Sequence, residues 1–326
     1  MFLPKPLLPL LVIAALAGPS LTPGHAQPGN KKISIAVIPK GTTQMYWKGV
    51  EAGARQAAKE LGIDMVWKGP LLENDRAQQI QIVEQFVSEG KSGIVLAPLD
   101  DVALKRPVDE ALAKHIPVVI IDSGLKGEVG KNFISYVSTD NRAAGRMAGE
   151  ELARVVGENG KVILMRYMEG QASTTEREEG CLEAIKQHPG IKILVDNRYA
   201  GATANEAQNT AMNIIDKIRQ ADGIFCPQES STFGMLLALR QNNLVGKVKL
   251  VGFDTSSPLI EGIKKGDIDA VVAQHPKKMA YEAVKIMVAY LHGEKVPERV
   301  DSGADLITAQ NVNTPEIQTL LGAITP

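Results

Sequence analysis

The stretch ISIAVIPKGTTQMYWKGVEAGARQAAKEL, residues 33–61, decides the fold class of this chain. Its first part, residues 33–39, is apolar and rich in β-branched side chains, which is typical of a strand buried on both faces of a sheet. Residues 47–61 have a helical composition, and Gly62 stands where a helix should end. A buried strand followed by a helix is the repeating unit of a parallel α/β fold.

The same alternation of short apolar runs and longer helical segments continues almost to the end of the chain. Further strands are predicted at 65–67, 93–97, 117–121, 161–165, 191–195, 223–226, 249–253 and 270–273. Further helices are predicted at 75–88, 102–115, 142–156, 175–187, 205–219, 232–241, 258–265 and 278–292, with a kink or restart at Pro107. Because this is too many strands for one comfortable doubly wound sheet, we expect two α/β domains with a parallel sheet each.

The first residues have the pattern of a secretory signal peptide. A basic start at Lys5 precedes an apolar run over residues 7–17, and small residues precede a cleavage site after Ala26. The run is too short to span a bilayer, and an ordinary buried helix is the alternative. No Cys lies near the cut, so we expect the mature chain to be free in the periplasm and not tethered by a lipid.

Composition excludes several functional classes. Removal of residues 1–26 from the 326-residue chain leaves 300 residues and a formal charge of −2, with no basic stripe, so nucleic acid is not an expected partner. Cys181 falls in a predicted helix and Cys226 in a predicted strand, which favours two separate buried thiols over a disulfide. Two cysteines and five scattered histidines have no metal-ligand spacing, and no metal or other cofactor is expected.

Polar side chains follow most of the predicted strands. In open parallel sheets, ligands bind beyond the carboxyl ends of the strands. The side chains at those ends are Lys40, Asp122, Gln228, Glu229, Asp254 and Gln274. Together they predict a ring of hydrogen-bonding groups around a ligand.

An enzyme is one alternative to a binding protein. Ser123, Asp254 and His275 could be combined into a Ser-His-Asp triad, but the chain has no G-x-S-x-G nucleophile elbow. No glycine-rich phosphate-binding motif follows the first strand either. We therefore expect no enzymatic activity.

The chain resembles the ribose-type periplasmic binding proteins of sugar transporters over nearly all of its predicted mature length. The matching motifs, in chain order, are Met45-Tyr46-Trp47, Val119-Ile120-Ile121-Asp122, Ser138-Thr139-Asp140-Asn141 with Gly145, Glu176-Arg177 with Gly180, Val251-Gly252-Phe253-Asp254, and Ala273-Gln274 with Pro276. No single motif is specific, but the ordered series at the family's spacing is strong. The same fold serves bacterial repressors, which have a helix-turn-helix where this chain has its predicted signal peptide.

The resemblance implies a periplasmic binding protein of type I, with two doubly wound parallel-sheet lobes joined by a three-segment hinge. One lobe would comprise residues 32–139 and 275–301, and the other 140–274 and 302–326. The lobes would close on a small sugar-like ligand, and the permease of an ABC importer in the inner membrane would bind the closed monomer. A chemoreceptor or sensor kinase is the alternative partner.

The resemblance also assigns ligand contacts. Tyr46 and Trp47 would lie against the apolar face of a sugar ring, and ordinary core packing is the alternative. Asp122 and Asp254 would accept from hydroxyl groups, and capping of the next helix is the alternative for both. Arg177 would donate from the second lobe, although it could instead be an exposed charge on a helix.

The amides of Gln228 and Gln274 would both donate and accept in the same shell. Asp140-Asn141 is interpreted as a hinge and helix start. Three departures from a plain ribose pattern leave the ligand open: Lys40, Thr175, and the stretch 199–203. Lys40, Pro227 and the stretch 199–203 resemble the subgroup that binds the furanosyl autoinducer or rhamnose, although Glu176-Arg177 stands where that subgroup has an acid-amide pair. A buried Lys40 needs either an anionic ligand or an acidic neighbour such as Asp122.

Overall fold

The computed structural model describes residues 1–3, 32–157 and 159–324. The predicted signal peptide therefore lies almost entirely outside the described residues. Within the described part of the chain, no helix is both long and apolar enough to cross a membrane.

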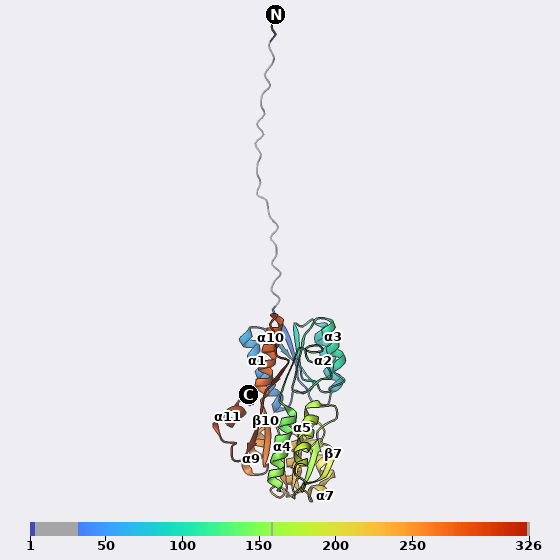
Figure 1. Ribbon diagram of the computed structural model, residues 1–326, viewed down its shortest axis with the longest axis vertical. Coiled ribbons are helices and arrows are strands. Elements are labelled where there is room, and N and C mark those ends of the chain that lie inside the picture. The colour runs from blue at the N-terminus through green and yellow to red at the C-terminus, as the bar shows by residue number, and fades with distance from the viewer. Residues whose placement is uncertain (4–31, 158, 325–326) are drawn as a thin grey trace. The chain divides into compact units, whose positions relative to one another are not determined.

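The first sheet has six strands in the order β11-β5-β4-β3-β1-β2, all paired in parallel. Its strands are β1 (Ser34–Ile38), β2 (Asp64–Trp67), β3 (Gly93–Leu96), β4 (Val118–Ile121), β5 (Ser135–Ser138) and β11 (Arg299–Asp301). Its helices are α1 (Met45–Leu61), α2 (Arg76–Ser88), α3 (Lys105–Ala113) and α10 (Pro276–Leu291). Helices α1 and α10 cover one face, and α2 and α3 cover the other (Figure 1). We call this sheet and its helices the first lobe.

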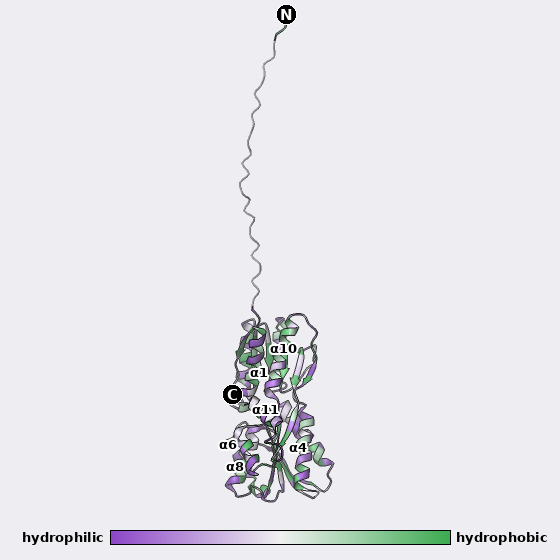
Figure 2. Ribbon diagram, turned by 90° about the vertical axis from the view of Figure 1, so that its left-hand side faces the viewer, coloured by the Kyte–Doolittle hydropathy of each residue, from purple (hydrophilic) through white to green (hydrophobic). Residues whose placement is uncertain are grey.

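The second sheet has the order β12-β10-β9-β8-β6-β7, in which only β12 is antiparallel to its neighbour. Its strands are β6 (Lys161–Arg166), β7 (Lys192–Tyr199), β8 (Gly223–Phe225), β9 (Lys249–Phe253), β10 (Ala270–Gln274) and β12 (Ala304–Thr308). Its helices are α4 (Asn141–Val156), α5 (Ala172–Lys186), α6 (Ala204–Asn213), α7 (Ile215–Ile218), α8 (Glu229–Gln241) and α9 (Ser257–Lys265). Helix α4 covers one face, and α6 and α8 cover the other (Figure 2). This is the second lobe.

The strands are apolar on both faces because both faces are covered by helices. In β1, Ile35 and Val37 pack toward α1 and α10, whereas Ala36 and Ile38 pack toward α2 and α3. In the second lobe the two cysteines lie in different clusters on opposite faces of the sheet, and both are free and buried.

The chain passes between the two sheets three times. It crosses after β5, after β10 and between β11 and β12. The last helix, α11 (Pro315–Ile324), follows β12 and packs Ile317 into a core cluster of the second lobe. The two sheets therefore have the same strand order but are built from interleaved segments.

Several predicted helices have different bounds in the structure, and two of the differences change the local geometry. The helix expected at 102–115 begins only at Lys105, so Pro107 lies in the first turn of α3, where its missing N–H breaks no helical hydrogen bond. Of the predicted kink or restart at Pro107, the structure therefore has a helix start and no kink. The helix expected at 205–219 is interrupted at Ile214, which ends α6 and precedes the single turn of α7.

Candidate functional site

A buried cavity lies where the two lobes meet, and residues of both lobes line it. Its free volume is about 10 Å³, close to what a single water molecule needs, so the side chains of the two lobes nearly fill it. The lining residues are Lys40, Tyr46, Trp47, Glu73, Asp122, Gln171, Ser173, Thr174, Arg177, Gln228, Asp254 and Gln274. All eight predicted site residues are among them.

Two aspartates occupy equivalent positions at this cavity, one from each lobe. Asp122 follows β4 and Asp254 follows β9, and both have a left-handed backbone, with φ of 63° and 68°. Their N–H groups donate across the sheet to Val137 O at 3.1 Å and Val272 O at 2.8 Å, respectively. A left-handed conformation costs a non-glycine residue about 1–2 kcal/mol. Strain of this kind is concentrated at functional sites.

Capping of the next helix does not explain either aspartate. The element after Asp122 is strand β5, and the helix after Asp254 has Ser256 as its N-cap. Glu229 is the first residue of α8, and its N–H donates to Asp254 Oδ2 at 3.1 Å. Asp254 therefore supports a helix that precedes it in sequence.

Lys40 has an acidic neighbour inside the protein. Its Nζ lies 2.7 Å from Asp122 Oδ2 and donates to Ser173 Oγ at 3.0 Å, and its side chain is only 3% exposed. A third bond, to Gln171 Oε1, is longer at 3.5 Å. The charge of Lys40 is thus compensated without an anionic ligand, and the lysine also joins the two lobes.

Tyr46 and Trp47 serve both the core and the cavity. Their rings pack edge to face, with centroids 5.0 Å apart, and both belong to the core cluster under α1 and α10. The Tyr46 hydroxyl donates to Asp122 Oδ1 at 2.7 Å, and Trp47 Nε1 donates to Glu73 Oε1 at 2.7 Å. Burial, together with Asp122, raises the pKa of Tyr46 well above its usual value, so this hydroxyl remains a donor.

Arg177 points into the protein, so the alternative of an exposed helix charge is wrong. Its side chain donates from Nε to Asn141 Oδ1 at 2.8 Å and from Nη1 to Pro227 O at 3.0 Å. The guanidinium lies 4.2 Å from the ring centroid of Phe253. These bonds use two of its five N–H donors.

Two glycines of the matching motifs allow Arg177 to reach the cavity. A Cβ at Gly145 of α4 would lie 2.2 Å from Arg177 O, and a Cβ at Gly180 of α5 would lie 2.1 Å from Arg142 O. Both distances are far inside van der Waals contact, so α4 and α5 can approach this closely only with glycine at both positions. At the start of α4, Asp140 caps the helix by accepting from Ala143 N–H at 2.9 Å, in agreement with its interpretation as a helix start.

The two glutamine amides are already engaged with the protein. Gln274 Nε2 donates to Asp254 Oδ1 at 2.7 Å. Gln228 is the N-cap of α8, and its Oε1 accepts from Ser230 N–H at 2.6 Å. Its Nε2 donates to Gln44 Oε1 in the first lobe at 3.1 Å, so Gln228 also links the lobes.

Four lining residues were missed by the sequence analysis: Glu73, Gln171, Ser173 and Thr174. Glu73 lies in the loop between β2 and α2. Its carboxyl group accepts from Trp47 Nε1 of the first lobe at 2.7 Å and from the Tyr167 hydroxyl of the second lobe at 3.1 Å. Burial raises the pKa of the Glu73 carboxyl. The other three lie at or just before the first turn of α5, a helix that we predicted to start only at Thr175.

The charges around the cavity favour a ligand that donates hydrogen bonds. Two cationic side chains face three carboxyl groups, those of Glu73, Asp122 and Asp254. Burial raises the pKa of Asp254, although Arg177 opposes this effect. Each carboxylate can accept about four hydrogen bonds, which leaves acceptor capacity for hydroxyl groups.

The Ser-His-Asp combination considered from the sequence is not assembled. Ser123 Oγ accepts from the backbone N–H of Ser173 at 3.1 Å. His275 Nε2 instead pairs with Asp305 Oδ2 at 2.7 Å. Within residues 32–157 and 159–324, no group of three or more His, Cys, Asp or Glu side chains could hold a metal ion.

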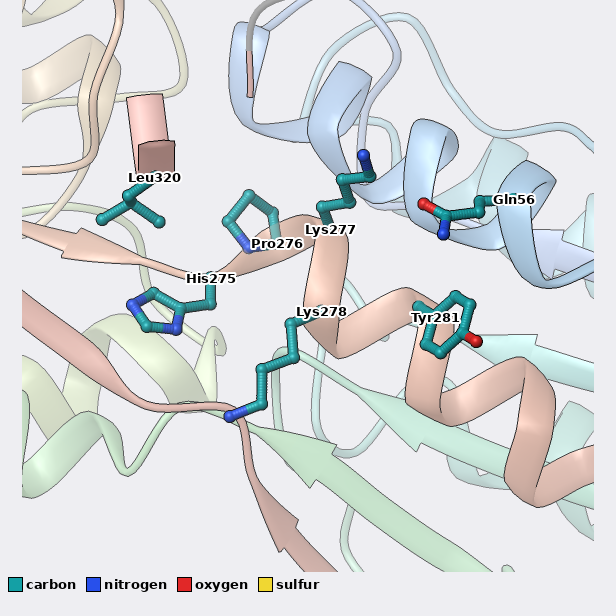
Figure 3. A pocket seen from close by; sticks show the side chains of 7 residues that line it. All are labelled: Gln56, His275, Pro276, Lys277, Lys278, Tyr281 and Leu320. Atoms are coloured by element: carbon teal, nitrogen blue, oxygen red, sulfur yellow. The ribbon is translucent and has the colours of Figure 1, made fainter. Parts of the chain in front are cut away.

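A second pocket lies where β10 runs into α10, and it has a different character. It has a volume of about 300 Å³ and is lined by Gln56, His275, Pro276, Lys277, Lys278, Tyr281 and Leu320. His275 and Leu320 lie on one side of it, and Gln56 and Tyr281 lie on the other (Figure 3). Its polar groups bind other parts of the protein: Lys278 donates to Ser302 O at 3.1 Å and Tyr281 to Glu60 Oε2 at 2.7 Å. Because this pocket has none of the buried charges of the first cavity, the first is the candidate site.

Comparison with known proteins agrees with the fold described above. The family described as "Periplasmic binding protein domain" matches residues 35–295. The ribose import binding protein RbsB of Haemophilus influenzae is 28% identical over 267 residues, which cover 82% of this chain and 88% of that protein. A carbohydrate transporter solute binding protein from Agrobacterium radiobacter, solved in complex with D-arabinose, is 35% identical with a TM-score of 0.85. The match covers 90% of this chain and 99% of that one.

A solute binding protein of an ABC transporter from Agrobacterium vitis, solved with bound D-fucose, is 32% identical with a TM-score of 0.85. The match covers 88% of this chain and 99% of that one. The two doubly wound sheets, their shared strand order and these matches lead to one conclusion: the chain belongs to the periplasmic binding protein family.

Proposed function

We propose that this chain is the substrate-binding component of an ABC importer and that it binds a neutral monosaccharide between its two lobes. The main supporting observation is the buried cavity in which both lobes present carboxylates, amides and cations, most of them at the ends of their strands. Relatives that bind ribose, D-arabinose or D-fucose support a sugar as the ligand class.

The charge of the cavity supports a neutral ligand with several hydroxyl groups. Its free volume of about 10 Å³ is too small for a sugar ring, so a ligand can enter only if the lobes move apart. Lys40 already pairs with Asp122, so it does not require an anionic ligand. Tyr46 and Trp47 line the cavity and would offer apolar surface to the C–H groups of such a ring.

The proposed hinge consists of the three chain crossings, which separate residues 32–139 and 275–301 from residues 140–274 and 302–326. Lobe closure would bury the ligand and form the surface that the permease recognises. After cleavage behind Ala26, the protein would act as a monomer in the periplasm. We propose binding without catalysis, because Ser123 and His275 are engaged with separate partners.

A thermal-shift screen of the mature protein tests this proposal. The panel contains pentoses, hexoses, deoxysugars, sugar acids and the furanosyl autoinducer. A ligand present at 100 times its Kd should raise the Tm by about 5 °C, because it binds only the folded state. We expect a neutral sugar to give this shift and the sugar acids to give none. A shift with the acids alone would contradict the neutral class, and no shift with any compound would contradict the sugar class.

A further inference from the structure

Helix α1 begins without the usual local capping. Its N-cap residue, Gln44, makes no side-chain capping bond, and its first turn contains no acidic residue. The first N–H groups of a helix have no partner inside the helix and need an acceptor from elsewhere. This turn is also the one that presents Tyr46 and Trp47 to the cavity.

The second lobe places a carboxyl group at this turn. The carboxyl group of Glu229, the first residue of α8, faces the backbone N–H groups of Met45 and Tyr46, which act to lower its pKa. Next to it, Gln228 donates to Gln44 at 3.1 Å. Two consecutive residues of the second lobe therefore hold the start of one helix of the first lobe.

Glu229 is itself held in place by the candidate site. Its own N–H donates to Asp254 Oδ2 at 3.1 Å. Asp254 lines the cavity, whereas Glu229 does not. A continuous chain of contacts thus runs from Asp254 through Glu229 to the turn that contains the two aromatic residues.

We propose that Glu229 is a positioning residue that acts as a closing latch: it caps α1 only when the lobes meet, and so holds Tyr46 and Trp47 against the bound ligand. This inference rests on the proposed function, because it assumes that the lobes open and close around a sugar. A latch formed after closure slows the dissociation of the ligand and leaves its association rate almost unchanged.

The surroundings of Glu229 should make the latch sensitive to pH. The charged groups that face it are Asp254, at the end of β9, and Glu73, in the loop before α2, and both are acidic. Burial and then Asp254 raise the pKa of Glu229 to about 7. One oxygen of the carboxyl, Oε2, is buried and has no hydrogen-bond partner among the described residues.

The direction of the pH effect follows from linkage. When the lobes are open, Glu229 is exposed to water and its pKa returns toward the ordinary value of 4.5. The closed form therefore binds the carboxyl proton of Glu229 more tightly than the open form. Between pH 4.5 and about pH 7, closure is accompanied by uptake of a proton. The latch is strongest at the acidic end of this range and weakens as the pH rises to 7.

Two measurements on the mature protein test the latch. The first is hydrogen exchange of the Met45 and Tyr46 amides, with and without D-arabinose or D-ribose. We expect Glu229→Ala to make both amides exchange about tenfold faster than in the unmodified protein. Glu261→Ala, which removes an exposed glutamate of α9 that pairs with Lys265, is the matched control and should change neither amide.

The second measurement is the dissociation rate of whichever of these two sugars binds. Glu229→Ala should release it about tenfold faster, with an association rate changed by less than twofold. Glu229→Gln keeps an acceptor oxygen but cannot titrate, so it should retain slow dissociation and lose part of the pH dependence between 5 and 7. A purely structural role would leave that pH profile unchanged.

The outcomes separate the latch from the proposed function. If the two amides exchange equally fast in the unmodified protein and in Glu229→Ala, under every condition, the latch is wrong even when a sugar binds. If Glu229→Ala accelerates exchange but neither sugar binds, the contact between the lobes stands and the sugar class of the proposed function is in question.

Discussion

The two lobes share one backbone plan but place different chemistry at the ends of equivalent strands. The strand order of the second sheet repeats that of the first, position by position. The ends of β4 and β9 both present an aspartate in the left-handed conformation. Their partners differ: Asp122 contacts the ammonium of Lys40, whereas Asp254 accepts from the amide of Gln274 and from a backbone N–H.

The same contrast appears after β3 and β8. The segment Ala97-Pro98-Leu99 in the first lobe corresponds to Cys226-Pro227-Gln228 in the second, so an apolar side chain is replaced by an amide. The second lobe also supplies Arg177, and the first supplies the aromatic pair. A repeated backbone therefore fixes where the ligand lies, and unequal side chains at those equivalent positions make the two walls of the site different.

The largest expected effect comes from exchanging each aspartate for its neutral isostere. Asparagine tolerates the left-handed backbone, so Asp122→Asn and Asp254→Asn test charge and not conformation. We expect Asp122→Asn to weaken binding of the sugar found by thermal shift at least about 100-fold, because the buried Lys40 loses its counter-charge. Asp254→Asn should cost about tenfold, because its protein partners are neutral donors.

Isothermal titration of both variants against the same sugar gives this comparison. Lys40→Met combined with Asp122→Asn is the control, since it removes both charges of the pair together. If the ligand-free double variant is more stable than ligand-free Asp122→Asn, the damage in Asp122→Asn comes from the unpaired charge of Lys40. Equal losses in the two single variants would contradict the difference between the lobes.

Much of this site could be predicted from the sequence, for a physical reason. A strand buried on both faces is a continuous apolar run, and the first polar residue after it marks the edge of the sheet where ligands bind. That rule found Lys40, Asp122, Gln228, Asp254 and Gln274. The resemblance supplied Tyr46, Trp47 and Arg177. Their shared cavity is observed, and their contact with a ligand stays a prediction.

The residues that escaped prediction lie where that rule has no signal. Glu73 lies in a loop several residues after the end of β2 in sequence, and β2 itself is partly exposed. The strands β5 and β11 were missed because Ser135–Ser138 and Arg299–Asp301 are short and contain polar residues. The contact of Glu229 with α1 depends on the packing of one lobe against the other, which sequence periodicity does not encode.

A second prediction compares close helix contacts in the two lobes. A Cβ at Gly53 of α1 would lie 2.0 Å from Lys277 O of α10, and a Cβ at Gly145 of α4 would lie 2.2 Å from Arg177 O of α5. Gly53→Ala and Gly145→Ala should each destabilise the protein by about 1–3 kcal/mol, because backbone must move in both cases. Urea unfolding measures this loss.

Only one of these two variants should also change the site. Gly145→Ala pushes on the backbone of Arg177 itself, so we expect the sugar to bind about tenfold more weakly to the fraction that stays folded. Gly53→Ala displaces a residue outside the cavity and should retain affinity within about threefold. Similar losses of affinity in the two variants would mean that Arg177 is not fixed by the contact between α4 and α5.

The smallest expected effect concerns a buried carboxyl that supports the second lobe alone. Glu178 accepts from the backbone N–H of Tyr167 at 2.9 Å and pairs with Arg166 at 2.8 Å. Burial nevertheless raises the pKa of Glu178 from 4.5 to about 7. Because the folded state holds this proton more tightly than the unfolded chain, its contribution to stability is complete below pH 4.5 and is lost as the pH rises to 7.

Glu178→Gln removes this titration and keeps an acceptor for the Tyr167 N–H. The free energy of unfolding of the unmodified protein should therefore fall between pH 5 and pH 7 by about 1–2 kcal/mol more than that of the variant. Glu179→Gln, a neighbouring change at an exposed carboxyl that pairs with Arg142, is the matched control. Parallel pH profiles for the unmodified protein and Glu178→Gln would show that Arg166 keeps Glu178 ionised, and that this lobe tolerates a buried charge as the first lobe does at Asp122.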